Sequence, residues 1–170
     1  MLFAVKELEL GKIPFKLSLA PGAIEFYDQK LRQATSLEVN GTAQLLPLGE
    51  IRVQGRLAGS MGAECDRCLE AMQFHLDGAF DLGYLPANAG WDEPEAPLEE
   101  EESDVGFYDG EGVQLADVVR EQIVLWLPMQ RICRPDCKGI CPQCGQNKNE
   151  KECGCREQTI DERWSALKNI

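Results

Sequence analysis

Alternating apolar and polar residues dominate the first half of the chain. Glycine or proline separates most of the apolar runs, for example at Pro21, Gly22 and Gly59. This pattern is typical of consecutive strands in an antiparallel sheet, so residues 1–87 are predicted to form a β-rich core that curls or closes like a barrel. The runs are Phe3-Val5, Leu8-Leu10, Phe15-Leu17-Leu19, Leu37-Val39, Ala43-Leu45, Ile51-Val53, Leu57, Met72-Phe74-Leu76 and Phe80-Leu82-Tyr84.

Two short segments within this half allow more specific expectations. Residues 27–34 are predicted to form a short helix. The dipeptide Asn40-Gly41 has two interpretations: it forms a tight hairpin turn, or the residues on either side continue one strand over a bulge.

The hydrophobic period changes after residue 113. Apolar residues then follow helical spacing, which predicts a helix over residues 114–127, with Asp117 in its first turn and Pro128 just past its end. The last turn is apolar on all sides, so we expect the C-terminal half to be buried against the sheet, with Trp126 in the core. The helical positions are Leu115, Val118, Val119, Ile123 and Trp126. Further on, Asp161 is a candidate N-cap for a short terminal helix that contains Trp164 and Leu167.

The excess negative charge is concentrated in one segment. The chain has 29 acidic and 17 basic residues and a formal charge of −12. Residues 88–112 contain ten of the acids and neither lysine nor arginine. Like charges, prolines and glycines make this segment a poor candidate for a packed element, so it is predicted to be a solvated loop or linker. An alternative is an electrostatic handle for a basic partner such as a ribosomal protein; the same charge opposes binding to nucleic acid.

The length of 170 residues favours one domain with a small appendage. Charges among the first seven residues argue against a signal peptide, and the longest charge-free apolar run, Ile123 to Met129, is too short to span a membrane. We therefore expect a cytoplasmic protein. That compartment disfavours disulfides, so its eight cysteines favour metal binding.

The cysteines form four close pairs, spaced C-x2-C, C-x3-C, C-x2-C and C-x-C. A tetrahedral zinc ion takes four thiolates, so eight cysteines match two such sites. One site is predicted from a zinc-knuckle sequence and the clip that follows it, Cys141, Cys144, Cys153 and Cys155. By elimination, the other joins the β-rich part to the segment after the helix, through Cys65, Cys68, Cys133 and Cys137.

Metal would have to supply the folding energy of residues 131–156, because the segment has few apolar residues beyond Ile132 and Ile140. Zinc is preferred, since intracellular thiolate clusters with this spacing are most often structural zinc sites. Rubredoxin-like iron is a rival, although Cys153-Gly154-Cys155 departs from its pattern, and a disulfide framework is the alternative to any metal.

No catalytic constellation is evident. The pair Cys65 and Cys68 follows one strand and precedes another, which places it in a hairpin turn and not at the helix N-terminus that a thioredoxin-like motif requires. His75, the only histidine, is expected to be structural. Neither a phosphate-binding glycine loop nor a serine nucleophile elbow is present, and no small-molecule substrate is indicated.

The arrangement of these motifs resembles the YceD family of bacteria and plastids. The resemblance covers most of the chain from Cys65 onward, and its specific part is Cys137 to Asn147. It implies a role in the accumulation of large-subunit ribosomal RNA, hence in ribosome assembly, without an established catalytic activity. The matching segments are Cys65-Asp66-Arg67-Cys68-Leu69-Glu70, Glu121 to Pro128, Cys137 to Asn147, Cys153-Gly154-Cys155 and Asp161-Glu162-Arg163-Trp164.

The predicted fold is α+β, with an antiparallel β core, one packed helix and a zinc-binding C-terminal segment. Its parts are residues 1–87, the acidic loop 88–112, the helical region 113–130 and the cysteine-rich region 131–170. The preferred function is a non-enzymatic ribosome biogenesis factor that binds large-subunit precursor RNA or a basic ribosomal protein. The alternatives are a thiol oxidoreductase using Cys65 and Cys68, and a zinc-dependent nucleic-acid-binding protein using Arg131, Arg134, Lys138, Lys148, Lys151 and Arg156.

Overall fold

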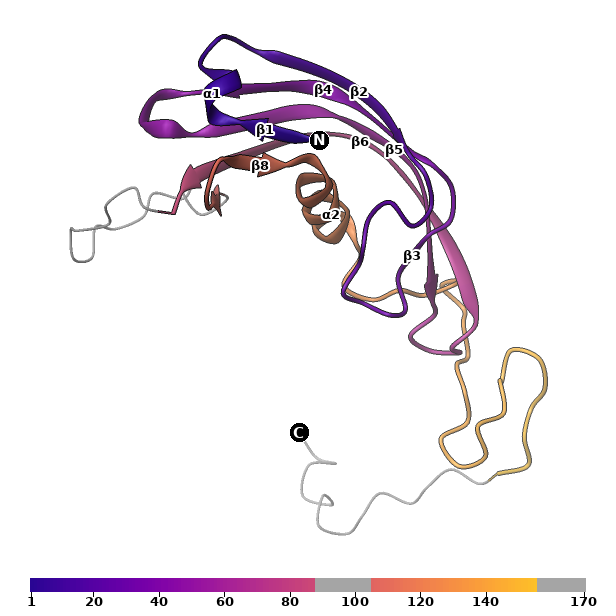
Figure 1. The fold of residues 1–170 in the computed structure, drawn as a ribbon. Coiled ribbons are helices and arrows are strands. Elements are labelled where there is room, and N and C mark those ends of the chain that lie inside the picture. The colour runs from indigo at the N-terminus through magenta and orange to yellow at the C-terminus, as the bar shows by residue number, and fades with distance from the viewer. Residues whose placement is uncertain (88–104, 156–170) are drawn as a thin grey trace, which may run out of the picture.

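A strongly curved sheet, with one helix packed in its concave side, makes up most of the computed structural model (Figure 1). The structure describes residues 1–87 and 105–155. The sheet has the strand order β2-β4-β5-β6-β7, and the short strand β3 pairs with β5 beyond the end of β4. Its strands are β2 (Ile13–Leu19), β3 (Arg32–Gln33), β4 (Leu37–Leu45), β5 (Ile51–Glu64), β6 (Ala71–Pro86) and β7 (Val105–Tyr108).

The remaining elements are short, apart from α2 (Leu115–Trp126). Strands β1 (Leu2–Ala4) and β8 (Gly112–Gln114) form a separate two-stranded ribbon next to α2. A helical turn, α1 (Val5–Leu8), and a 3-10 turn, η1 (Pro47–Gly49), connect strands. No helix in residues 1–87 and 105–155 is long and apolar enough to cross a membrane.

The predicted α+β class is confirmed, but the described strands do not close into a barrel. All strand pairs of the large sheet are antiparallel except β6 and β7, which are parallel. The outer strands β2 and β7 do not pair with each other; instead, α2 and the β1–β8 ribbon cover the concave side (Figure 1). Burial of that face by a helix removes the need for closure, because the apolar residues already have a partner layer.

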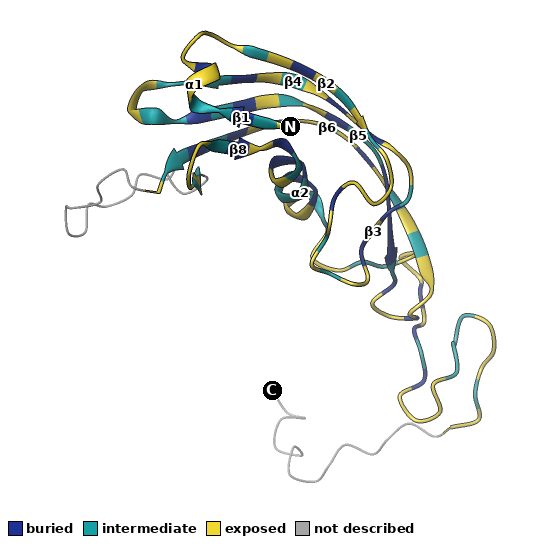
Figure 2. Cartoon of the chain, in the orientation of Figure 1, coloured by how far each residue is buried: buried dark blue, intermediate teal, exposed yellow. Residues whose placement is uncertain are grey.

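The period-2 pattern matches the observed faces of the long strands. Along β5, Ile51, Val53, Leu57 and Met61 are fully buried, while the residues between them are more accessible (Figure 2). The hairpin of β5 and β6 pairs continuously from Ile51 with Tyr84 to Glu64 with Ala71. This hairpin contains the two longest strands of the sheet, and its turn carries Cys65 and Cys68.

Three expectations need correction, and one alternative is decided. Residues 27–34 contain no helix; Leu31 is buried as part of an irregular loop, where the Asp28 carboxylate accepts a hydrogen bond from the amide of Lys30. The Leu8-Leu10 strand is also wrong, because Leu8 ends α1 and Leu10 is exposed. Of the two interpretations of Asn40-Gly41, the continuous strand is confirmed: both residues lie within β4, whose pairing with β5 runs through them without a bulge, and there is no hairpin turn. Val105–Tyr108, predicted as loop, forms β7.

The predicted helix is confirmed as α2, and its buried side faces the sheet (Figure 2). Trp126 packs against the core, over Gly78 of β6. The expectation that the whole C-terminal half is buried is wrong, because Val124 and Leu125 are exposed. The remainder of the acidic segment, residues 88–104, and the terminal helix predicted around Asp161 lie outside the described residues.

Two glycines face each other in neighbouring strands of the sheet, Gly41 in β4 and Gly55 in β5. The register aligns Phe15, Gly41, Gly55 and Phe80 in one row across four strands. A Cβ atom on Gly41 would lie 2.1 Å from the main-chain oxygen of Gln54 and 2.9 Å from Cζ of Phe15. The two aromatic rings therefore occupy the space that side chains on the glycines would need.

We predict that Gly41→Ala lowers the free energy of unfolding by about 1–3 kcal/mol, because the new methyl group meets main-chain atoms that cannot move freely. Thr42→Ala, at the exposed neighbouring position of the same strand, is the matched control and should change it by less than about 0.5 kcal/mol. Urea unfolding measures both. Equal stability of the two variants would contradict the proposed packing.

Candidate metal centres

The eight cysteine sulfurs lie in two groups of four, and the members of each group are within 4.8 Å of one another. The groups are those that the spacing predicts. We call Cys65, Cys68, Cys133 and Cys137 the inner centre and Cys141, Cys144, Cys153 and Cys155 the outer centre. All eight cysteines are free, so no disulfide framework is present.

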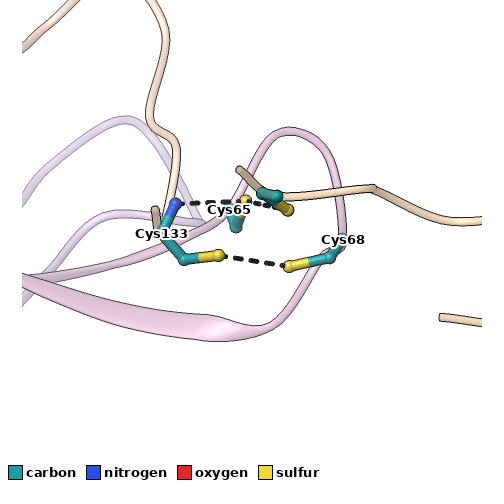
Figure 3. Close-up of side chains that lie close together, drawn as sticks. Cys65, Cys68 and Cys133 are labelled. Atoms are coloured by element: carbon teal, nitrogen blue, oxygen red, sulfur yellow. Dashed lines mark hydrogen bonds between the residues drawn. The ribbon is translucent and has the colours of Figure 1, made fainter. Parts of the chain in front are cut away.

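The sulfur positions of the inner centre fit a tetrahedral metal ion. The Cys65 and Cys137 sulfurs are 3.9 Å apart. Those of Cys68 and Cys133 are 3.7 Å apart (Figure 3). Four sulfurs at about 2.3 Å from one ion have tetrahedral edges of about 3.8 Å. A disulfide would require about 2.05 Å, so the spacing matches shared coordination and not a covalent bond.

The inner centre joins two parts of the fold that are distant in sequence. Cys65 and Cys68 lie in the turn between β5 and β6, as predicted, and Cys133 and Cys137 follow α2. Cys65 and Cys137 are almost fully buried, and with Cys68, Met72 and Ile132 they form a small second core. The sulfurs thus replace the large side chains that would otherwise hold the segment after α2 against the hairpin.

Main-chain and side-chain hydrogen bonds secure the same junction. The Asp66 amide donates to the carbonyl of Arg131 at 2.8 Å, and the Arg131 amide donates to the Asp66 carboxylate at 2.7 Å. The Arg131 guanidinium also pairs with Asp28 at 2.7 Å. Nearby, the amide of Ile140 donates to the carbonyl of Arg67. Arg131 is therefore held by protein groups.

The two centres contain the same knuckle, a five-residue turn that begins at a cysteine. In each, the residue after the second cysteine has a left-handed backbone, with φ of 62° at Leu69 and 72° at Gly145. The Leu69 amide donates to the carbonyl of Cys65 at 2.9 Å, and the Gly145 amide donates to that of Cys141 at 2.9 Å.

A second hydrogen bond repeats in the same way. The Cys65 amide donates to the carbonyl of Glu70 at 2.8 Å, and the Cys141 amide donates to that of Gln146 at 2.8 Å. The sequence predicted a turn at both cysteine pairs, but it indicated the knuckle conformation only at Cys141, where a glycine follows the second cysteine; at Cys65 a leucine occupies that position. Aligning the two cysteine pairs would have revealed the shared conformation.

Each centre combines a readily ionised thiol with one that resists ionisation. Burial raises the pKa of Cys65, but hydrogen bonds from the amides of Cys133 and Cys68 outweigh it and lower the pKa to about 6. Burial and the adjacent Cys137 sulfur raise the pKa of Cys133 to about 12. Several thiolates this close repel one another, so full ionisation requires a cation among them.

The outer centre shows the same contrast. The amides of Cys144 and Gln143 lower the pKa of Cys141 to about 6. At Cys155, the Cys144 sulfur and then burial raise the pKa to about 12. Soft thiolates without oxygen or nitrogen ligands suit zinc or iron. Each group can therefore hold one such metal ion.

The basic residues proposed for nucleic-acid binding, and the single histidine, lie outside the two centres. Arg134 pairs with Asp136, and Lys138 pairs with Glu152. Lys148 and Lys151 form no ion pair within the described residues, and Arg156 lies outside them. His75 is on the exposed face of β6, where its Nδ1 is 2.8 Å from the Ser60 hydroxyl. Three of the five described candidates, Arg131, Arg134 and Lys138, are thus already paired.

The comparisons with known proteins place both centres within one matched region. Residues 53–170 match the family model described as large ribosomal RNA subunit accumulation protein YceD. An uncharacterized protein of Mycobacterium tuberculosis is 33% identical over 117 residues, which cover 69% of this chain and 54% of that protein. The chain thus spans about half the length of the mycobacterial relatives it matches.

A chloroplast protein of Arabidopsis thaliana, named large ribosomal RNA subunit accumulation protein YCED homolog 1, is 29% identical over 58 residues. That match covers 34% of this chain and 18% of the plant protein. No solved structure matches the chain significantly.

We predict that exchanging the residues at the two left-handed positions has opposite effects. Leu69→Gly should raise the free energy of unfolding by up to about 1 kcal/mol, because glycine adopts this backbone without steric cost. Gly145→Leu should lower it by about 1–2 kcal/mol for the same reason. Chemical unfolding in reducing buffer with saturating Zn²⁺ measures both. A loss of stability in Leu69→Gly would show that the two knuckles are not equivalent.

Proposed function

The chain belongs to the YceD family, and on that premise we propose that it serves the assembly of the large ribosomal subunit as a non-enzymatic binding factor in the cytoplasm. The match over residues 53–170 carries this proposal, because it includes the β5–β6 hairpin, α2 and both four-sulfur groups. The name of the plant relative also refers to accumulation of large-subunit ribosomal RNA.

We propose that both centres bind Zn²⁺ and that their role is structural. Four cysteines complete the tetrahedral coordination of zinc, which leaves no position for a substrate or an activated water. The metal would supply folding energy of about 10 kcal/mol to a segment with few buried apolar side chains. This closed coordination also argues against a thiol oxidoreductase, since Cys65 and Cys68 would be metal ligands and not a free redox pair.

A basic protein is favoured over RNA as the direct partner. The formal charge of −12 becomes −16 when eight thiolates add −8 and two Zn²⁺ ions add +4. Near the centres, Arg131, Arg134 and Lys138 are engaged in ion pairs, which leaves Lys148 and Lys151 as the unpaired candidates among the described residues. Phosphate binding requires free cations, whereas a negative protein attracts a basic one at long range.

Deletion of the gene tests the role in assembly. We expect less large-subunit ribosomal RNA relative to small-subunit RNA, and co-sedimentation of the native protein with large-subunit precursors. Cys141→Ser combined with Cys144→Ser should abolish rescue, because the outer centre loses two ligands. Glu150→Ala, an exposed change in the same segment, should rescue fully. An unchanged RNA ratio, together with a protein found only in ribosome-free fractions, would contradict the proposal.

A further inference from the structure

A groove runs along one flank of α2, between the helix and strands β6 and β7. Its first part is a cavity of about 400 Å³ at the start of β7. A second hollow of about 490 Å³ shares Glu121 with the first and continues toward β8. We call the two together the α2 groove. The walls of the first part include Asp81, Leu82, Val105, Glu121, Gln122 and Leu125.

Beside the groove, a long strand edge lacks a partner. β6 pairs with β5 along its length, but β7 pairs only with Gly83 to Pro86 of β6. Residues 71–82 of β6 therefore have a strand neighbour on one side only within the described part of the chain. The groove opens at the first residue of β7, Val105, which pairs with Gly83 of β6. The unpaired edge of β6 begins next to this point. Such an edge can accept an added strand.

The groove also presents side chains without internal partners. Gln122 is only 6% exposed, lines the cavity and makes no side-chain hydrogen bond to the described residues. Its amide atoms are not fully buried, since Gln33 Oε1 alone among the described side chains is a buried polar atom without a partner, so the Gln122 amide opens onto the cavity. There it can both donate to and accept from a peptide main chain. Next to it Leu125 is 63% exposed, an apolar side chain turned toward the groove and away from the core.

The charge of the groove identifies the kind of partner. Neither hollow is lined by lysine or arginine. Asp81 pairs with Arg52, and Asp117 pairs with Arg120. The remaining carboxylates are Glu121, which accepts a hydrogen bond from Tyr84, and Asp109 and Glu111, none of which forms an ion pair within the described residues. This surface attracts cations and repels phosphate.

We propose that the α2 groove binds an extended, basic segment of a partner protein. The segment adds to the free edge of β6 as a strand, its apolar side chains contact Leu82 and Leu125, and its lysines or arginines face Glu121 and the carboxylates of the second hollow. Gln122 supplies a hydrogen bond to its main chain. Only the biological setting of this inference rests on the proposed function; the binding itself does not.

Other occupants fit less well. RNA is disfavoured by the carboxylates. The segment of this chain that leads into Val105 has the sequence Glu99-Glu100-Glu101-Glu102-Ser103-Asp104, which carries the same sign of charge as the groove. A basic polypeptide is the occupant that satisfies the strand edge, the apolar wall and the charge together.

The experiment measures binding of a fluorescent 12-residue peptide of alternating lysine and valine to the full, zinc-loaded chain. Leu125→Arg places a cation in the groove at an exposed position, so it should weaken binding by at least about tenfold. Leu10→Arg, at a residue that is 91% exposed and lines neither hollow, is the matched control and should stay within about twofold of the unchanged chain. Glutamate in place of lysine, or N-methylation of alternate peptide amides, should abolish binding.

Three outcomes would overturn the inference: no binding of the lysine–valine peptide, equal effects of the two arginine variants, or binding of single-stranded RNA that competes with the peptide. Gene rescue separates this inference from the proposed function. If deletion impairs large-subunit RNA and Leu125→Arg rescues fully, the groove inference fails while the function stands. If deletion has no effect but Leu125→Arg loses the peptide, the function fails while the groove stands.

Discussion

Coordination of one ion by four sulfurs, which we propose for each group of cysteines, is the interaction on which the shape of residues 131–155 would depend. The inner centre draws two ligands from the β5–β6 turn and two from the segment after α2. Among residues 1–87 and 105–155, Met72 and Ile132 are the only side chains besides the cysteines that contribute to the small core there. Without a cation, the thiolates that form as these four cysteines lose protons would repel one another. A cation bound among them would attract every thiolate and so offset this repulsion.

The sheet and the two cysteine centres are stabilised in different ways. Burial of β5, the concave face and α2 stabilises the sheet without metal, because its core is large and apolar. The knuckles then extend from the end of the longest hairpin (Figure 1). With zinc bound as we propose, closed coordination would give these knuckles their shape and leave no open position for a substrate. A partner protein would therefore bind to the surface of the molecule and not at the centres. The α2 groove has an apolar wall, an unpaired strand edge and unpaired carboxylates in one place.

Much of this could be predicted from residue patterns, and the failures have physical causes. Period-2 alternation located the long strands because one face of each is buried. It failed at Leu8 and Leu10, where a short pattern fits a helical turn equally well. Residues 27–34 were predicted to be helical, yet the Asp28 carboxylate accepts a hydrogen bond from the Lys30 amide and Leu31 is buried in a loop. β7 was missed because acidic neighbours masked a four-residue strand.

The grouping of cysteines was predictable because chelate spacing restricts which sulfurs can meet. The left-handed backbone at Leu69 was not, since leucine rarely adopts it and only the repeated hydrogen bonds reveal it. The exposure of Leu125 was also unpredictable, because an apolar helix end gives no sign of which side lacks a covering layer.

Native mass spectrometry combined with hydrogen exchange tests whether bound metal holds the cysteine-rich segment in shape. We expect two zinc ions per chain. After chelation under reducing conditions, residues 65–70 and 131–155 should lose protection while β4 and β5 keep theirs. A metal-free chain whose cysteine-rich segment stays equally protected would contradict this expectation.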